Sequence, residues 1–226
     1  MITYIFGLPI YVGSFTDPTE VIEEIEYCKN NKKVIEETNE VEELGGELEK
    51  DEGILFDLRN YKNETPYINN EIKVQIKNFL KELNIQNIEL SMNMCGNVYC
   101  NGSSCSDYWF NIYSKGDYTS SHWHLSDPDD ETFCQPIEAM FSFNYFAKYN
   151  PETHASLYFE NPSPMHILYE EIEDEIPEFK KSVKLEIKEG QIVIFPSCLL
   201  HYVERHEVDD KRITLSGNLY KVTTQK

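Results

Sequence analysis

From residue 87 onward, short β-branched and aromatic runs alternate with turn residues, and this pattern constrains the fold more than any other feature of the sequence. Val183–Ile187 alternates apolar and charged side chains with period two, and Gln191–Phe195 is more fully apolar and ends at Pro196. Regularly spaced short strands of this kind are typical of an all-β sandwich or barrel. The runs lie at 88–94, 107–113, 138–147, 155–159, 183–188, 191–195 and 212–221.

The N-terminal part differs, because two of its segments repeat apolar side chains at helical spacing. Leu8–Val12 predicts a short opening strand. Asp17 followed by proline is a typical helix start, and the apolar pattern after it predicts a helix over 18–30. A second apolar stripe predicts a helix over 67–84. In a β-rich protein such helices usually buttress a sheet.

We expect these parts to form one domain, 1–226, in which a mixed helical part (1–86) precedes a β core (87–226). The segment 35–53 is acidic, contains Gly45-Gly46 and lacks strong periodicity, so it predicts a loop or weakly ordered excursion. The sequence shows neither internal repeats nor a flexible linker. One domain is therefore the simplest interpretation.

A net charge of −20 is the most unusual bulk property of the chain. A surface this acidic repels phosphate backbones, so we expect no duplex nucleic acid as partner. With 40% hydrophobic residues the chain can still bury a core. No basic region precedes the apolar start, and no apolar run approaches the roughly 18 residues that cross a bilayer. We therefore expect a soluble, cytoplasmic protein without a membrane partner.

Three histidines have the spacing of a metal site. In His122-Trp123-His124 both imidazoles could reach one metal ion, because side chains at i and i+2 of a strand point to the same face. Trp123 should then face the opposite side and lie in the core. His201 is the best candidate for a third ligand, since it follows Pro196, where an apolar strand ends.

Arg212 opens an apolar, alternating strand that follows His201 in the chain. A buried arginine needs an anionic partner, because an unpaired buried charge is costly, and the planar guanidinium matches a carboxylate. Thr214 should face the same side and add a hydroxyl group. Each signal is weak by itself, but a close pair of ligands, a distant third ligand and an arginine one strand later together match a recognised site plan.

Several stretches resemble a known family. Trp109–Asp117 followed by His122-Trp123-His124 is similar to the N-Y-x-x-G-D…H-x-H segment of a group of 2-oxoglutarate–iron(II) oxygenases, largely uncharacterised and frequent in marine bacteria and their phages. The resemblance touches the whole chain and is dense over 109–162 and 187–218. Further matching stretches are Phe6–Tyr11, Tyr158–Pro162, Gly190–Ser197, His201 and Arg212–Asn218.

The resemblance implies a mainly β fold, the double-stranded β-helix (jelly roll, cupin-like), buttressed by the N-terminal helices. It implies that His122, His124 and His201 bind iron(II), with 2-oxoglutarate as cosubstrate and its distal carboxylate on Arg212. The implied enzyme is a dioxygenase that uses dioxygen to hydroxylate a small-molecule or peptidyl substrate. It would act in the cytoplasm of a bacterium, or of the host if a phage encodes it.

Two residues on the strand that enters the site, Asn111 and Tyr113, are expected either to contact the cosubstrate or simply to pack. One departure from the wider superfamily is that His124 takes the place of the usual carboxylate, which leaves the iron with one more positive charge. Asp127 is the nearest carboxylate downstream and is an alternative ligand. The acidic stretch 125–136 is longer than the family's usual link, and it is either a substrate-selecting lid or surface decoration.

Two further hypotheses stay open at this point. A three-histidine cupin-type dioxygenase that uses no keto acid would share the metal site, but it would have no use for a carboxylate anchor at Arg212. A non-enzymatic β-sandwich binding protein would carry these histidines incidentally and would retain no metal. The role of Arg212 separates the first hypothesis from the oxygenase, and metal content separates the second.

Overall fold

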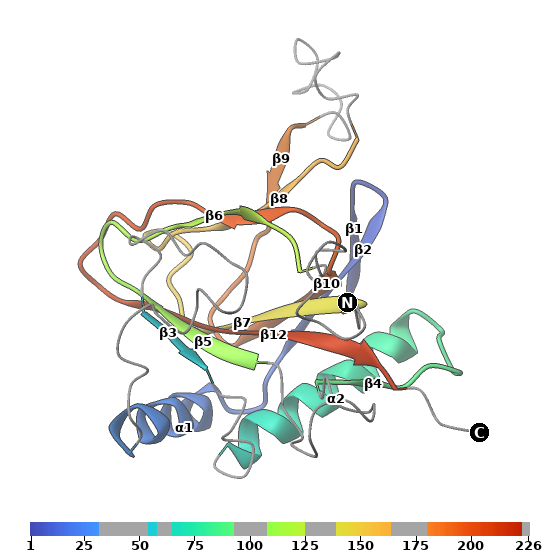
Figure 1. Cartoon of the computed structure of the whole chain (residues 1–226), viewed down its shortest axis with the longest axis horizontal. Helices are drawn as coiled ribbons and strands as arrows, with labels where there is room; N and C mark the ends of the chain where they lie inside the picture. Colours follow the sequence, from blue (N-terminus) through green and yellow to red (C-terminus); the bar gives the residue numbers. More distant parts are fainter. Residues whose placement is uncertain (32–53, 58–64, 93–107, 125–138, 164–179, 223–226) are drawn as a thin grey trace, which may run out of the picture.

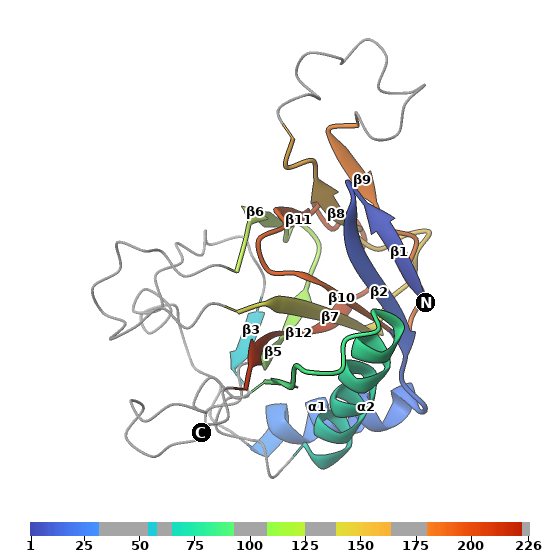
Figure 2. The ribbon, with the colours of Figure 1, turned by 90° about the vertical axis from the view of Figure 1, so that its right-hand side faces the viewer.

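The computed structural model describes residues 1–31, 54–57, 65–92, 108–124, 139–163 and 180–222. Over these ranges the chain forms two antiparallel sheets with two helices packed beneath them (Figures 1 and 2). No helix in the described ranges is long and apolar enough to cross a membrane. The expected loop 35–53, the stretch 125–136 and the alternative ligand Asp127 lie outside the described residues.

The larger sheet has the strand order β1-β2-β10-β7-β12-β5-β3, and β4 pairs with β12 outside this order. Its strands come from both ends of the chain, and we therefore propose that the chain folds as one domain. Their bounds are β1 (Ile2–Ile5), β2 (Leu8–Ser14), β3 (Ile54–Asp57), β4 (Leu90–Ser91), β5 (Tyr108–Tyr113), β7 (Phe141–Lys148), β10 (Gln191–Pro196) and β12 (Arg212–Lys221).

The smaller sheet faces one side of the larger sheet and has the order β6-β11-β8-β9. All strand pairs in both sheets are antiparallel. The two facing sheets confirm the mainly β jelly-roll fold that the resemblance implied. Their strands are β6 (Thr119–His122), β8 (Leu157–Glu160), β9 (Ser182–Lys184) and β11 (His201–Val203).

The helices α1 (Pro18–Asn31) and α2 (Pro66–Glu82) cover the other side of the larger sheet, as predicted (Figure 2). Asp17 begins α1, because its carboxylate accepts a hydrogen bond from the Thr19 N–H. The carboxylate of Glu24 accepts hydrogen bonds from the backbone N–H groups of Tyr67 and Ile68, which are unsatisfied at the start of α2. The two helices are thus fixed to each other at this end.

Each central strand of the larger sheet sends alternate side chains to its two faces, and the two faces differ in polarity. In β12, Leu215 and Leu219 join the apolar core between the sheet and the helices. Arg212, Thr214 and Ser216 alternate with them, and they are buried on the face toward the smaller sheet. The space between the two sheets is therefore lined with polar groups along β12, beside an apolar cluster that includes Phe146, Phe159, Val193 and Phe195.

Most predicted strands are confirmed, with boundary differences that have simple causes. The expected strand 183–188 ends at Lys184, and Ile187 instead buries its side chain in the core between the sheets. The expected strand 88–94 is described only as far as Met92, of which Leu90–Ser91 is a strand. Four short strands, β1, β3, β6 and β11, were not among the predicted runs.

Candidate active site

Two of the predicted metal ligands meet as a cross-strand pair in the smaller sheet. His122 is the last residue of β6 and His201 the first of β11, and they lie directly opposite each other in the register. Directly opposed residues in antiparallel strands hold their side chains side by side on one face. The two imidazole centroids are 4.3 Å apart. Strand pairing thus unites residues that are far apart in the sequence.

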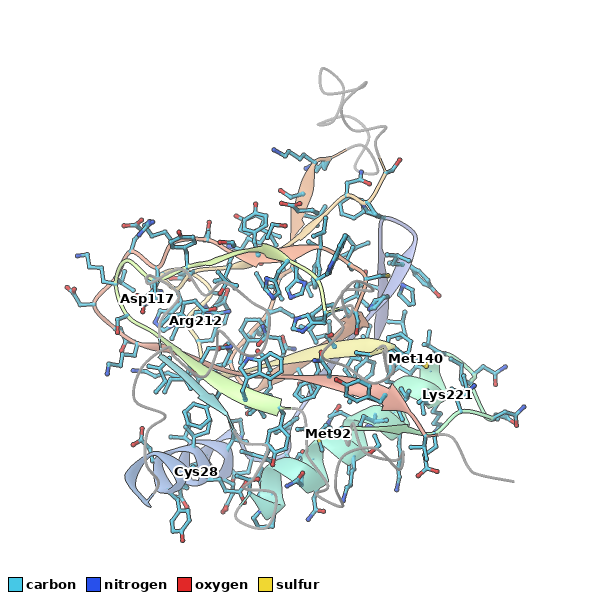
Figure 3. The ribbon with its side chains drawn as sticks, viewed as in Figure 1. Cys28, Met92, Asp117, Met140, Arg212 and Lys221 are labelled. Atoms are coloured by element: carbon cyan, nitrogen blue, oxygen red, sulfur yellow. The ribbon has the colours of Figure 1, made fainter. Side chains whose placement is uncertain are left out.

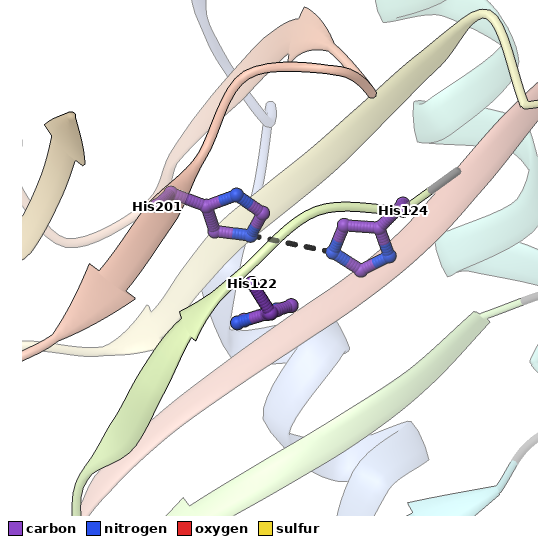
Figure 4. A group of neighbouring side chains, drawn as sticks. All are labelled: His122, His124 and His201. Atoms are coloured by element: carbon purple, nitrogen blue, oxygen red, sulfur yellow. Dashed lines mark hydrogen bonds between the residues drawn. The ribbon is translucent and has the colours of Figure 1, made fainter. Parts of the chain in front are cut away.

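His124 joins this pair from beyond the end of β6 (Figure 4). Its backbone N–H donates to the carbonyl of Ser197, which fixes the chain after the strand, and its ring stacks on Trp109 at 5.8 Å. Its Nε2 lies 3.3 Å from Nε2 of His201. One ligand atom from each of the three histidines falls within 4.8 Å of the others, so a single metal ion can bind all three.

In His122 and in His201, a hydrogen bond to one ring nitrogen determines which nitrogen is left to bind a metal. Nδ1 of His122 contacts the carbonyl oxygen of Ser120 at 2.8 Å, and Nδ1 of His201 contacts that of Leu199 at 2.9 Å. A carbonyl accepts, so in each ring Nδ1 carries the proton and Nε2 keeps its lone pair. Backbone partners of this kind orient histidine ligands in metal sites.

The electrostatics favour the neutral imidazoles that a metal requires. Burial lowers the pKa of His122, and burial together with nearby His122 lowers the pKa of His124 to about 3. The pKa of His201 lies well below its usual range, first because of burial and then because of the other two histidines. All three are uncharged at pH 7, so metal binding needs no loss of protons at that pH.

Among the described residues, Arg212 is the largest fully buried side chain, with none of its surface exposed. Its guanidinium lies over the rings of Tyr113, Phe146 and Tyr149, at 4.7, 5.4 and 5.9 Å from their centroids. Nη1 contacts the hydroxyl oxygen of Thr214 at 3.4 Å, but Nε and Nη2 have no hydrogen-bond partner. Burial lowers the pKa of this guanidinium, although it stays protonated. A buried charge in this state needs an anion.

The other residues predicted to bind a cosubstrate lie beside Arg212 as expected. Thr214 faces the same side and supplies the hydroxyl described above. Tyr113 lies opposite Arg212 in the register, and its hydroxyl is hydrogen-bonded to that of Thr119. Asn111, opposite Thr214, donates from Nδ2 to the hydroxyl of Ser216 at 3.2 Å. The structure therefore places all of them together, on the face of β5 and β12 that looks toward the smaller sheet.

Two further histidines, His154 and His206, are also buried, but their nitrogens already have partners. Nε2 of His154 lies 3.3 Å from the carboxylate of Asp210, and its Nδ1 accepts the N–H of Asn150. Nε2 of His206 donates to the carbonyl of Asp210, and its Nδ1 accepts the N–H of Ala155. These two rings hold the turn that leads into β12 and offer no lone pair to a metal.

One prediction was wrong and one residue was not predicted. Trp123 was expected in the core, but it is 56% exposed, because it points away from the histidines on either side of it, toward the side on which Ser121 is exposed too. Asn144 was not predicted, although it is 8% exposed and its amide oxygen has no hydrogen-bond partner. The available signal was a single asparagine inside the apolar run of β7.

Comparisons with known proteins concern the family and the fold. Residues 107–218 match the family described as "Putative 2OG-Fe(II) oxygenase". That range contains both strands of the histidine pair and most of β12. A search of curated proteins found no sequence match.

Among solved structures, a Pseudomonas putida prolyl-4-hydroxylase aligns with a TM-score of 0.54 and 14% identity, over 93% of this chain and 91% of that one. The collagen prolyl hydroxylase of Paramecium Bursaria Chlorella virus-1, in complex with 2OG, aligns with a TM-score of 0.54 and 12% identity, over 95% and 96%. HygX from Streptomyces hygroscopicus, with nickel and 2-oxoglutarate bound, gives 0.53 and 10%, over 93% and 82%. At these identities the likeness concerns the fold.

The family match and the grouped histidines lead to one conclusion about the chemistry. Enzymes of this family use iron(II) and 2-oxoglutarate. The chain belongs to the 2-oxoglutarate–iron(II) oxygenases, and it is a dioxygenase that depends on both.

Proposed function

We propose that this enzyme hydroxylates a C–H bond of a small-molecule or peptidyl substrate, with iron(II) on His122, His124 and His201 and the distal carboxylate of 2-oxoglutarate on Arg212. Thr214, Asn111 and Tyr113 complete the pocket for the cosubstrate. Two structural neighbours are named as prolyl hydroxylases, which supports hydroxylation as the reaction. Bound together, iron(II) and 2-oxoglutarate supply the oxidising chemistry: one atom of dioxygen enters the substrate and the other enters succinate, with release of CO₂.

One observation carries this proposal: the buried guanidinium of Arg212 has two nitrogens without a partner. Nε and one terminal nitrogen of an arginine form the fork that a carboxylate accepts bidentately. A buried charge left unpaired is costly, so its presence between the sheets fits a protein that completes the pair with a ligand. These two nitrogens are the donors that the distal carboxylate of 2-oxoglutarate requires, so the residues present fit this cosubstrate.

The spacing along β12 also fits a short dicarboxylate. Arg212 and Ser216 lie four residues apart in one strand, about 13 Å along the backbone. Ser216 pairs with Trp109, the residue on which His124 stacks. The guanidinium therefore marks one end of the space between the sheets, and the histidines lie over a position nearer the other end. The side chain of Arg212 would reach over part of this distance, so that it and a metal on the histidines could hold a five-carbon acid at its two ends.

The protein's own groups would orient and neutralise the bound anion. Arg212 would balance the distal carboxylate, while Thr214 and Tyr113 would contribute hydroxyl groups beside it. Three neutral imidazoles add no negative charge, so the metal site is more positive by one charge than a site with two histidines and a carboxylate. We infer that this charge strengthens the attraction for the anionic end of the keto acid at the metal.

A three-histidine dioxygenase without a keto acid is the competing function, and Arg212 argues against it. Such an enzyme needs no carboxylate anchor, so the two orphaned nitrogens of the buried arginine would cost stability without serving its reaction. The hypothesis of a non-enzymatic binding protein is not supported, because the chain belongs to a family of enzymes. The oxygenase is therefore the function that we adopt.

Anaerobic titration tests the assignment. Iron(II) and then 2-oxoglutarate are added to the metal-free protein while the visible absorption of the iron–keto-acid chelate is recorded. We expect a band that needs both ligands and saturates at one of each per chain. A protein that binds iron but gives no band with 2-oxoglutarate would favour the competing dioxygenase, and one that binds neither would overturn the proposal.

A further inference from the structure

The face of the larger sheet that looks toward the smaller sheet, here called the floor, carries polar side chains beneath the histidines. β7 directs Ser142 and Asn144 to this side, since the alternating Phe143 and Tyr145 lie in the core next to the helices. Phe146, two residues after Asn144, belongs to the core between the sheets, which confirms the direction. A polar side chain at such a position is unusual in an apolar strand and invites a functional explanation.

The strand register places Asn144 close to the metal site. Across β5, β12 and β7, the residues Trp109, Ser216 and Asn144 lie directly opposite one another in one row. Neighbouring residues of such a row have Cβ atoms about 5 Å apart. Trp109, at one end of the row, stacks on His124. Asn144 on β7 is therefore separated by a single strand, β12, from Trp109, on which the proposed metal ligand His124 stacks.

The next row of the sheet, which contains Ser142 and Phe195, lies next to His201. Ser142 pairs with Phe195 of β10, and the Phe195 ring lies 4.8 Å from the ring of His201. His124 thus lies over β5 and His201 over β10, and β12 and β7 run between these strands. Asn144 is on β7, so its side chain belongs to the part of the floor that the histidines span.

Asn144 differs from its polar neighbours because it lacks a partner. Ser142 donates to the amide oxygen of Asn218 and contacts the hydroxyl of Ser197, both at 2.8 Å, and Ser216 accepts from Asn111. The amide oxygen of Asn144 is buried without any hydrogen bond. An orphaned buried polar atom costs stability, and that of Asn144 lies on the face of the sheet where a ligand between the two sheets could pair with it.

We propose that the side-chain amide of Asn144 donates a hydrogen bond to the metal-bound end of 2-oxoglutarate. This inference rests on the proposed function. A half turn of the amide exchanges its oxygen and nitrogen with almost no change in shape, and the nitrogen then offers two N–H donors to a carboxylate. Arg212 would hold one end of the cosubstrate and Asn144 would hold the other, so that both carboxylates are recognised.

The cosubstrate fits this position better than the substrate does. Met140, just before β7, is 38% exposed, whereas Arg212 at the other end is fully buried (Figure 3). Ser142 lies between Met140 and Asn144, so Asn144 is on the inner side of the floor. A substrate that approaches from the end at Met140 would meet the position of Ser142 first, while a ligand between Arg212 and the histidines would reach Asn144.

The test compares two substitutions at adjacent residues. Asn144→Leu keeps the branched outline of the side chain and removes its polar atoms. Tyr145→Phe is the matched control, because the Tyr145 hydroxyl is also buried without a partner but lies on the opposite face of the sheet. Calorimetric titration of 2-oxoglutarate into each nickel(II)-loaded protein measures affinity without turnover, and thermal unfolding of the metal-free proteins measures stability.

We expect Asn144→Leu to weaken 2-oxoglutarate binding by roughly 10- to 100-fold, as for a lost hydrogen bond to a charged group. Nickel affinity and metal-free stability should be unchanged or higher, and Tyr145→Phe should bind 2-oxoglutarate like the wild type. Asn144→Ser repeats the test with a smaller side chain if the leucine variant does not fold. A purely structural asparagine would instead lower stability and leave the affinity alone.

Wild-type binding keeps the two proposals apart. If the wild type binds 2-oxoglutarate and both Asn144 variants bind it equally well, the role of Asn144 is overturned while the proposed function stands. If the nickel-loaded wild type does not bind 2-oxoglutarate at all, the proposed function itself fails.

Discussion

Replacement of Arg212 by methionine shows separately what the buried guanidinium contributes to stability and what it contributes to cosubstrate binding. Methionine keeps a long unbranched side chain and removes the guanidinium. In the metal-free protein, the two orphaned nitrogens cost about 1–3 kcal/mol each. The three ring contacts of the guanidinium each contribute about 0.5–2 kcal/mol in the other direction. These sums are similar, so the free energy of unfolding should change by less than about 2 kcal/mol.

The effect on cosubstrate binding should be much larger. Removal of one partner of a buried, hydrogen-bonded charge pair costs about 2–5 kcal/mol, and a loss of about 3 kcal/mol weakens binding about 150-fold. Titration of 2-oxoglutarate into the nickel(II)-loaded protein measures this loss, and urea unfolding of the metal-free protein measures stability. Arg205→Met is the control, because Arg205 is an exposed arginine that donates to the carbonyl of Gly116.

Two results would refute the reasoning. If Arg212→Met binds 2-oxoglutarate within about threefold of the wild type, which is under 1 kcal/mol, the guanidinium does not hold the carboxylate. If the metal-free variant loses more than about 4 kcal/mol of stability, the charge has a partner inside the protein and is a structural ion pair. Arg205→Met should bind 2-oxoglutarate like the wild type.

Three further outcomes follow from the structure. His201→Ala should lower iron affinity more than about 100-fold, because even partners that only orient a ligand are worth 10- to 100-fold; full metal occupancy measured by elemental analysis would show that His201 is no ligand. The folded-state pKa values of His124, at about 3, and of His201 lie below the unfolded value, so the stability that these two groups contribute is complete above about pH 6.5 and is lost at up to about 1.4 kcal/mol per pH unit for each as pH falls below it. A melting temperature that stays constant from pH 7.5 to about 5 would contradict these shifts. Phe79→Ala should cost about 3–5 kcal/mol in urea unfolding, because Phe79 is fully buried and packs its ring on Phe141 at 4.8 Å; a loss under about 1 kcal/mol would mean that α2 does not support the sheet.

The sequence predicted the parts of the fold whose periodicity comes from burial. The helices α1 and α2 and the strand β12 each bury one regular set of apolar residues, and β10 buries a short continuous apolar run, so these patterns are readable in the sequence. The short strand β6 is Thr119 to His122, a polar run without such a set, and it was missed for that reason. It exists because β11 pairs with it, and no local pattern encodes that partner.

The same distinction applies to the candidate site. The three histidines were grouped correctly from their spacing and from the resemblance, because ligand residues are rare and conspicuous. Trp123 is exposed because the side of the chain opposite the two histidines is not covered by the core, and the sequence does not mark that. Asn144 was missed because one asparagine in an apolar strand has no distinctive spacing, and only the register across three strands brings it under the histidines.

Succinate formation tests the central claim most directly. The wild-type protein is incubated in air with iron(II) and 2-oxoglutarate but no added substrate, and succinate is quantified over time. We predict slow succinate formation that stops when iron, 2-oxoglutarate or dioxygen is omitted and that falls sharply in Arg212→Met. An iron-loaded protein that neither binds 2-oxoglutarate nor forms succinate would contradict the account.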